Sequence, residues 1–157
     1  MALALLTIGI ALASATALIW ARRSRNQSEL ERHSLSVEEL HSLMASGQKV
    51  SLFDVRQPLD LLAHLELIPG AHRIPPQEVL NTPSLLPRDE DIVVYCTCPS
   101  DKTSQSILRR ALALGFTRIR FLTGGLAAWK EKGYPVEPYQ ESFRLSTSTV
   151  TPTAGSS

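Results

Sequence analysis

The hydrophobic and polar positions along the chain change their pattern several times, and each change marks an expected region. Residues 2–21 are almost continuously apolar, whereas residues 22–35 are polar and charged. Between residues 36 and 138, short runs of β-branched and aromatic residues alternate with segments whose apolar positions lie three or four residues apart. Residues 139–157 are rich in Ser and Thr with few apolar residues, which predicts a disordered tail.

The middle region alternates between the two periodicities at short intervals. Ser36 and Glu39 form a capping-box pattern before an apolar stripe that ends at Gly47. Further helices are expected over 59–67, 103–114 and 126–132, and strands over 49–55, 91–96 and 118–122. The run at 91–96 is apolar enough to suit a strand that is buried on both faces of a parallel sheet. The pattern therefore predicts one α/β domain over residues 36–138 with a mainly parallel sheet.

The first apolar run is long enough to cross a bilayer. As a helix, residues 2–21 would span about 30 Å. No Lys or Arg precedes the run, which argues against a cleaved signal peptide, although the small residues at 13–17 leave cleavage open. Arg22, Arg23 and Arg25 follow it, and the positive-inside rule places them in the cytoplasm. We expect a single-pass transmembrane helix over 1–21, a lipid bilayer as partner, a juxtamembrane linker over 22–35 and a cytoplasmic domain.

Composition narrows the classes of function. The formal charge is only +1 and no basic patch alternates with aromatic residues, so nucleic-acid binding is not expected. The two cysteines lie two positions apart, which makes neither a disulfide framework nor a structural zinc site. The 4 histidines show no metal-ligand spacing. No metal and no organic cofactor are therefore predicted.

Both cysteines lie where parallel-sheet proteins place their chemistry. Cys96 ends the apolar strand, and Cys98 stands in the loop before the next helix. Backbone N–H groups and the positive end of a helix dipole favour the thiolate, which is the reactive form of cysteine. The pattern predicts a reactive thiol in a strand–loop–helix arrangement, and a reducing cytoplasm would suit it.

Four motifs, in order, resemble the rhodanese (sulfurtransferase) family. They are Phe53-Asp54-Val55-Arg56, Ile68-Pro69-Gly70-Ala71, Val93-Val94-Tyr95-Cys96 and Leu122-Thr123-Gly124-Gly125-Leu126-Ala127-Ala128-Trp129. The resemblance covers the expected domain, but neither the N-terminal segment nor the tail. It implies a central parallel sheet with helices on both faces. It also implies a cysteine that accepts sulfane sulfur as a persulfide and passes it to a thiophilic acceptor.

The resemblance leaves two candidates for the nucleophile. The family's loop commonly has a cysteine, four variable residues, Arg or Thr, and then Ser, which Cys98 matches through Thr103 and Ser104. Cys96 instead matches the family's strand-end cysteine, but with a loop two residues longer. We therefore expect Cys98 to be catalytic, with Cys96 as the alternative. Cys96 would otherwise pack as a small apolar residue, or attack a persulfide on Cys98.

The rest of the loop is expected to bind the substrate. A persulfide's outer sulfur is anionic and needs several N–H donors. Lys102 would favour an anionic donor, Asp101 would oppose it, and Thr103 is expected to cap the helix. Pro99 removes one N–H donor and the family's Arg before Ser is absent, which argues against efficient use of thiosulfate more than against persulfide chemistry, and the donor stays thiosulfate or a persulfide. The expected substrate-binding residues of the loop are Pro99, Ser100, Asp101, Lys102, Thr103 and Ser104.

Outside the loop, Arg56 and Asp54 allow two interpretations. Arg56 follows a strand and could attract an anionic substrate, or it could form a structural ion pair with Asp54. Gly124, Gly125 and Trp129 are expected to shape a turn and the core near the site.

Two other functions remain open. One is a catalytically weak rhodanese-fold module that binds a partner or senses sulfur or redox state at the membrane. The other is a phosphatase or arsenate reductase, since Cys96 and Lys102 have the spacing of that loop's Cys and Arg. Lys is a poor substitute for the planar guanidinium that clamps phosphate, which disfavours this second alternative.

Overall fold

The computed structural model describes the backbone of residues 2–97 and 101–139 and the side chains of residues 13–97 and 101–139. Its centre is a five-stranded sheet with the order β1-β6-β5-β2-β4, in which every neighbouring pair is parallel. The strands are β1 (Ser34–Leu35), β2 (Val50–Asp54), β4 (His72–Arg73), β5 (Asp91–Tyr95) and β6 (Ile119–Leu122). A small antiparallel sheet pairs β3 (Glu66–Leu67) with β7 (Glu137–Pro138).

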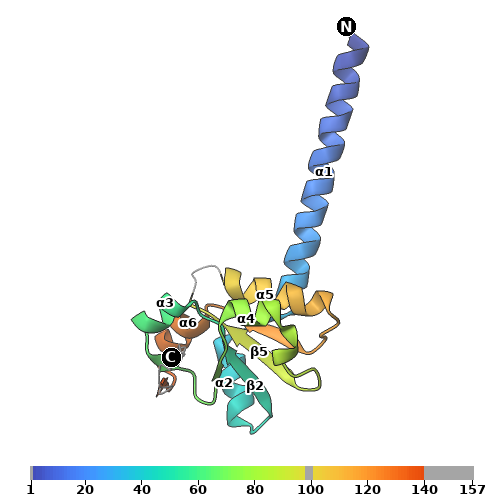
Figure 1. Cartoon of the computed structure of the whole chain (residues 1–157). Helices are drawn as coiled ribbons and strands as arrows, with labels where there is room; N and C mark the ends of the chain where they lie inside the picture. The colour runs from blue at the N-terminus through green and yellow to red at the C-terminus, as the bar shows by residue number, and fades with distance from the viewer. Residues whose placement is uncertain (1, 98–100, 140–157) are drawn as a thin grey trace, which may run out of the picture.

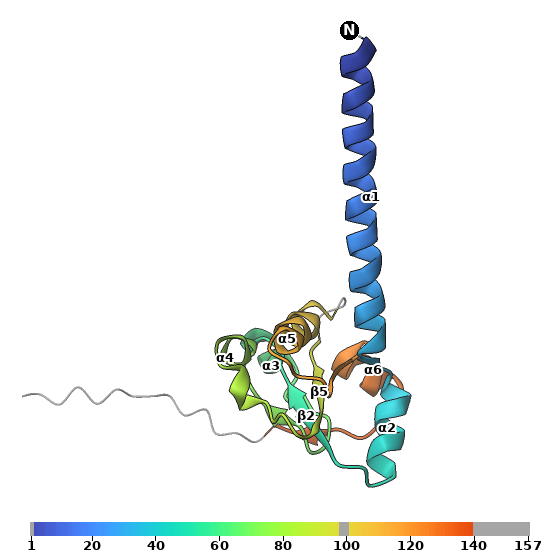
Figure 2. The same cartoon turned by 90° about the vertical axis from the view of Figure 1, so that its right-hand side faces the viewer.

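Helices cover both faces of the central sheet, which confirms the expected architecture. Figure 2 shows α4 and α5 on one side of β2 and β5, and α2 and α6 on the other. The buried residues accordingly form two clusters, because successive strand side chains such as Val93 and Val94 point to opposite faces. The shorter elements are α2 (Val37–Ala45), α3 (Pro58–Ala63), α4 (Pro76–Asn81), the 3₁₀ helix η1 (Pro83–Leu85), α5 (Lys102–Ala113) and α6 (Gly125–Glu131).

The predicted capping box begins α2. The Glu39 N–H donates to the Ser36 hydroxyl at 3.2 Å, and the Ser36 N–H donates to the Glu39 carboxylate at 2.8 Å. These bonds satisfy two backbone donors that the helix itself leaves unpaired, and they lower the pKa of Glu39. The helix expected over 59–67 is shorter, because Leu67 joins β3 and α3 ends at Ala63.

The N-terminal region differs from the expectation of a linker over 22–35. A single helix, α1, runs from Ala2 to Arg32 and extends away from the domain (Figure 1). Polar residues such as Arg, Gln and Glu are good helix formers, and no Gly or Pro interrupts 22–32. The chain then enters β1, where the Phe121 and Thr123 N–H groups donate to the His33 and Leu35 carbonyls, each at 2.9 Å. Residues 22–32 are thus helix, His33 forms a turn, and residues 34–35 form an edge strand.

The structure does not support the expected transmembrane helix. Across the residues that it describes, no helix is both long and apolar enough to span a bilayer. Most of the expected span over 1–21 lies outside the described side chains, and the expected tail over 140–157 lies outside the described residues altogether.

Replacing a leucine under α2 tests the core between that helix and the sheet. Leu40 is fully buried, so Leu40→Ala leaves a cavity, and we expect it to lower the free energy of unfolding by about 2–5 kcal/mol. Leu59→Ala removes the same atoms from a side chain that is 78% exposed, and should cost less than about 0.5 kcal/mol. Urea denaturation measures both changes, and equal losses would contradict this packing.

Candidate active site

The carboxyl ends of the central strands bring the predicted site together. In the sheet order β5 lies between β6 and β2, and Asp54 at the end of β2 is the register partner of Tyr95 at the end of β5. Cys96 follows Tyr95 directly, and residue 101 begins the approach to α5. The segment between them holds Cys98, Pro99 and Ser100, which lie outside the described residues. Their predicted roles therefore stay predictions.

The backbone of Cys96 is held by the turn before α6. Its carbonyl accepts a hydrogen bond from the Leu126 N–H at 3.2 Å. Gly125 lies so close that a Cβ built on it would stand 1.8 Å from the Cys96 oxygen, and its φ of +50° also favours glycine. The double glycine of the sequence motif thus has a physical cause at Gly125, which is the close approach of two backbone segments.

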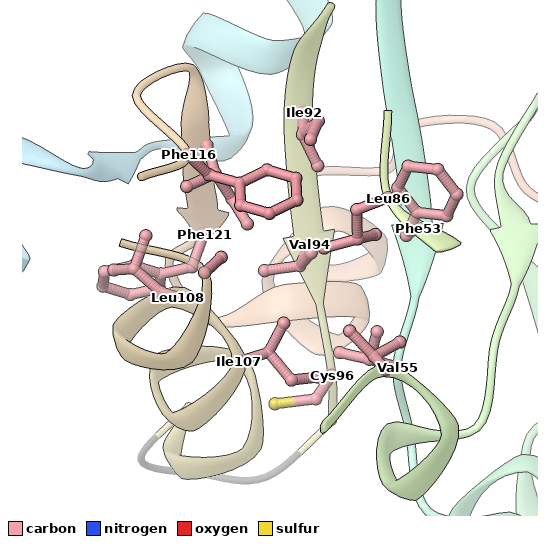
Figure 3. Close-up of a cluster of buried hydrophobic side chains, with 13 residues drawn as sticks. Phe53, Val55, Leu86, Ile92, Val94, Cys96, Ile107, Leu108, Phe116 and Phe121 are labelled. Atoms are coloured by element: carbon pink, nitrogen blue, oxygen red, sulfur yellow. The ribbon is translucent and has the colours of Figure 1, made fainter. Parts of the chain in front are cut away.

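The side chain of Cys96 lies in an apolar environment. The residue is fully buried and belongs to the cluster between the sheet and α5, with Val55 and Ile107 near it (Figure 3). Its sulfur points toward the first turn of α5 in the same view. Because apolar surroundings disfavour a charged thiolate, this placement suits the packing role that the sequence allowed for Cys96.

Asp101 connects the two halves of the site. It is the N-cap residue of α5, with a left-handed backbone (φ 50°, ψ 21°) that Asp tolerates better than most residues. The Gly124 N–H donates to one carboxylate oxygen at 3.0 Å, while the other oxygen is buried and has no hydrogen-bond partner among the described residues. Burial raises the pKa of Asp101, and the bond from Gly124 opposes that rise.

The expectation that Thr103 caps α5 is wrong, since Asp101 occupies the N-cap position. The Asp101 side chain reaches Gly124 and makes no capping bond to α5. The first N–H groups of a helix have no partner within the helix, and they carry the positive end of its dipole. Ser104 is fully buried in this first turn, and its hydroxyl has no partner within the part of the chain that the structure describes. The start of α5 can therefore stabilise an anion.

The ion pair between Asp54 and Arg56 is fully buried. Arg56 Nη2 and Nε lie 2.6 and 2.8 Å from Asp54 Oδ2, and both side chains have no exposed surface. Two further guanidinium bonds, each 2.8 Å long, reach the carbonyls of His64 and Glu66. This geometry favours the structural interpretation of Arg56. Contact between Arg56 and a substrate stays a prediction.

Trp129 is also internal. It is 1% exposed, and its indole N–H donates to the Pro135 carbonyl at 2.8 Å. Tyr134 packs against its ring and stacks on His41. No group of three metal-ligating side chains occurs among the described residues.

The comparison with known proteins agrees with this geometry. A rhodanese-like domain matches residues 36–132. The chain belongs to the rhodanese-like family. The matched segment contains β2, β5, α5 and β6, and therefore the whole candidate site, whereas α1 lies outside it.

Two of the similar proteins are named as sulfurtransferases. A sulfurtransferase of Allochromatium vinosum is 30% identical over 99 residues, which cover 63% of this chain and 89% of that protein. A probable adenylyltransferase/sulfurtransferase of Mycobacterium tuberculosis is 31% identical over 104 residues, covering 64% of this chain but 25% of that protein. The crystal structure of a rhodanese-related protein from Thermoplasma volcanium superposes with a TM-score of 0.57 at 26% identity, over 69% of this chain and 99% of that one.

Breaking the buried ion pair should destabilise the protein strongly. Arg56→Met leaves the Asp54 carboxylate buried without its cation, and we expect a loss of about 3–5 kcal/mol in the free energy of unfolding. Arg118→Met removes the same kind of pair with Asp91 at the surface, where Arg118 is 52% exposed, and should cost about 0–1 kcal/mol. Urea denaturation measures both losses. A loss for Arg56→Met no larger than the small loss expected for Arg118→Met would show that the buried pair has no structural role.

The Asp101 carboxyl should make stability depend on pH. Because its pKa is raised in the folded protein, the folded state holds this proton more tightly than the unfolded chain does. The resulting stabilisation is complete below about pH 4 and disappears as the pH rises through the folded pKa. The unfolding free energy of the wild type, minus that of Asp101→Asn, should therefore fall as the pH rises from about 4 through the folded pKa of Asp101. Urea denaturation from about pH 3 to 7 measures this difference, and a difference that rises with pH would contradict a raised pKa for Asp101.

Proposed function

We propose that this chain is a sulfurtransferase that carries sulfane sulfur as a cysteine persulfide from a thiosulfate or persulfide donor to a thiophilic acceptor. The observation that carries the proposal is a cysteine-bearing loop between the carboxyl end of β5 and the start of α5, inside a rhodanese-like domain. The sulfurtransferase of Allochromatium vinosum supports it, because the alignment covers 89% of that protein.

The reaction has two displacement steps. The cysteine thiolate attacks the sulfane sulfur of the donor, a new S–S bond forms on the enzyme, and the donor's S–S bond breaks to release sulfite or a thiolate. An acceptor nucleophile then attacks the outer sulfur of the persulfide, and the enzyme's cysteine leaves as a thiolate. Both steps transfer sulfur without an external oxidant or reductant.

Cys98 is the proposed nucleophile and Cys96 is the alternative. The burial of Cys96 supports Cys98, since burial disfavours the charged thiolate that the reaction needs. The direction of the Cys96 sulfur toward the first turn of α5 is the observation that favours the alternative (Figure 3).

The charges at the start of α5 favour a singly charged donor. The helix N–H groups and the exposed Lys102 attract any anion. The Asp101 carboxylate repels the same anion, because it lies buried at the N-cap of α5 and one of its oxygens has no hydrogen-bond partner among the described residues. This repulsion grows with the charge of the donor, so it is stronger for the thiosulfate dianion than for a persulfide monoanion.

The same carboxyl supports a second candidate function. A catalytically weak module that binds a partner, or senses sulfur or redox state, would tolerate an acidic residue beside its anion site. Attachment to a lipid bilayer through residues 2–21, with the domain on the cytoplasmic side, stays a prediction from the sequence.

Single cysteine replacements test both the activity and the nucleophile. Cys98→Ser should abolish persulfide loading and turnover, because the attacking thiolate is gone, whereas Cys96→Ser should still gain the mass of one sulfur atom. Intact mass after treatment with thiosulfate or a low-molecular-weight persulfide measures loading, and thiocyanate or sulfide release measures turnover. A persulfide on Cys96 in the Cys98→Ser variant would overturn the choice of nucleophile. If the folded wild type gains no sulfur from any of the donors, the result would support the binding or sensing module.

A further inference from the structure

The helix α3 presents an apolar face to solvent. Its exposed residues are all apolar, namely Pro58, Leu59, Leu62 and Ala63. Leu59 and Leu62 are 78% and 63% exposed and lie three positions apart, so they share one side of the helix. Leu65, two residues beyond the helix, is 54% exposed. We call these three leucines the α3 patch. A surface helix ordinarily turns polar residues outward, so the patch has the composition of a contact surface.

The position of the α3 patch is fixed by the buried ion-pair network. α3 begins at Pro58, a few residues after β2 ends at Asp54, and therefore lies at the carboxyl edge of the sheet. The Arg56 guanidinium donates to the carbonyls of His64 and Glu66, which flank Leu65. Figure 1 shows α3 at the periphery of the domain and away from α1, so α1 does not cover the patch.

The described chain ends beside the patch. β7 pairs antiparallel with β3, and the residue after β7, Tyr139, donates its N–H to the Leu65 carbonyl at 2.8 Å. Tyr139 is the last residue that the structure describes, so residues 140–157 begin at the patch itself. Because α3 precedes β3 in the chain, the antiparallel pairing directs the chain after Tyr139 toward α3.

The sequence that follows Tyr139 suits this surface. Its largest apolar side chains, Phe143 and Leu145, lie two positions apart, so an extended backbone turns both to the same side and Arg144 to the other. Phe143 and Leu145 follow Tyr139 by four and six residues, which gives a reach of at most about 14 and 21 Å. α3 has 6 residues and is therefore about 9 Å long, so this reach covers its length.

We propose that residues 140–145 of this chain dock on the α3 patch, with Phe143 and Leu145 packed against Leu59 and Leu62. Removal of apolar surface from water on both sides favours the contact. The bond between Tyr139 and Leu65 already holds the start of the segment at the patch, which keeps the entropic cost of closing the contact small. The segment lies outside the matched residues 36–132, so the contact is a feature that this chain adds to the rhodanese-like domain.

Limited trypsin digestion of the full chain tests the docking. Trypsin cleaves after Arg144, inside the proposed contact, and mass spectrometry of the released residues 145–157 measures the rate. In the double variant Leu59→Gln/Leu62→Gln the apolar contact is lost, so the segment is undocked more of the time. We expect cleavage after Arg144 to become about fivefold faster, because cleavage follows the population of the open form.

A matched control makes the same two changes at leucines outside the patch. Leu85 and Leu114 are 46% and 37% exposed, and in Leu85→Gln/Leu114→Gln the cleavage rate after Arg144 should stay within about twofold of the wild type. Cleavage of the α3 double variant at the wild-type rate, or equal acceleration in the control, would overturn the proposal.

Hydrogen exchange tests the contact from the other side. In Phe143→Gln/Leu145→Gln the backbone amides of residues 59–64 should exchange about fivefold faster than in the wild type, because α3 loses its cover. Val150→Gln changes an apolar residue of the same segment outside the proposed contact, and exchange should stay within about twofold of the wild type. Unchanged exchange over α3 in the Phe143→Gln/Leu145→Gln variant would contradict the docking.

Sedimentation of the full chain identifies the occupant. Docking within one chain predicts the same oligomeric state for the wild type and for both double variants, Leu59→Gln/Leu62→Gln and Phe143→Gln/Leu145→Gln. A dimer that dissociates in these variants would make a second copy of the chain the occupant of the patch, and would overturn the proposal.

Discussion

The buried ion pair between Asp54 and Arg56 is the constraint on which the carboxyl edge of the sheet depends. Burying two charges is costly unless every donor and acceptor finds a partner. Arg56 meets that condition through Asp54 and through the carbonyls of His64 and Glu66, so it ties the end of β2 to the segment between α3 and β3. Arg73 adds a bond to the Arg56 carbonyl at 2.7 Å. This network holds the end of β2 in place beside β5. The charges of Asp54 and Arg56 are paired with each other inside the protein.

The opposite side of the site is held by close backbone contacts. Gly125 packs directly against the Cys96 carbonyl, and Asp101 joins the start of α5 to Gly124. Both ends of the cysteine loop are therefore attached to the turn that follows β6. The Asp101 side chain therefore joins two parts of the site, because it lies at the N-cap of α5 and accepts a hydrogen bond from the Gly124 N–H.

The N-terminal helix gives this rhodanese-like domain a surface that the domain alone does not have. α1 reaches the core through Leu30, and its exposed polar face lines a groove with α5 and β6.

The sequence by itself determined the features that depend on neighbouring residues: the parallel α/β domain, the capping box at Ser36 and the rhodanese motifs around Cys96. Local periodicity and short motifs carry these directly. Only the tertiary structure decided which groups Arg56 binds inside the protein, that Asp101 and not Thr103 is the N-cap residue of α5, and that a groove runs along α1. Each depends on contacts between segments far apart in the chain, such as Asp101 with Gly124. The energy of a charged or polar group is set by whether such a contact buries it with a partner, and no local pattern specifies that.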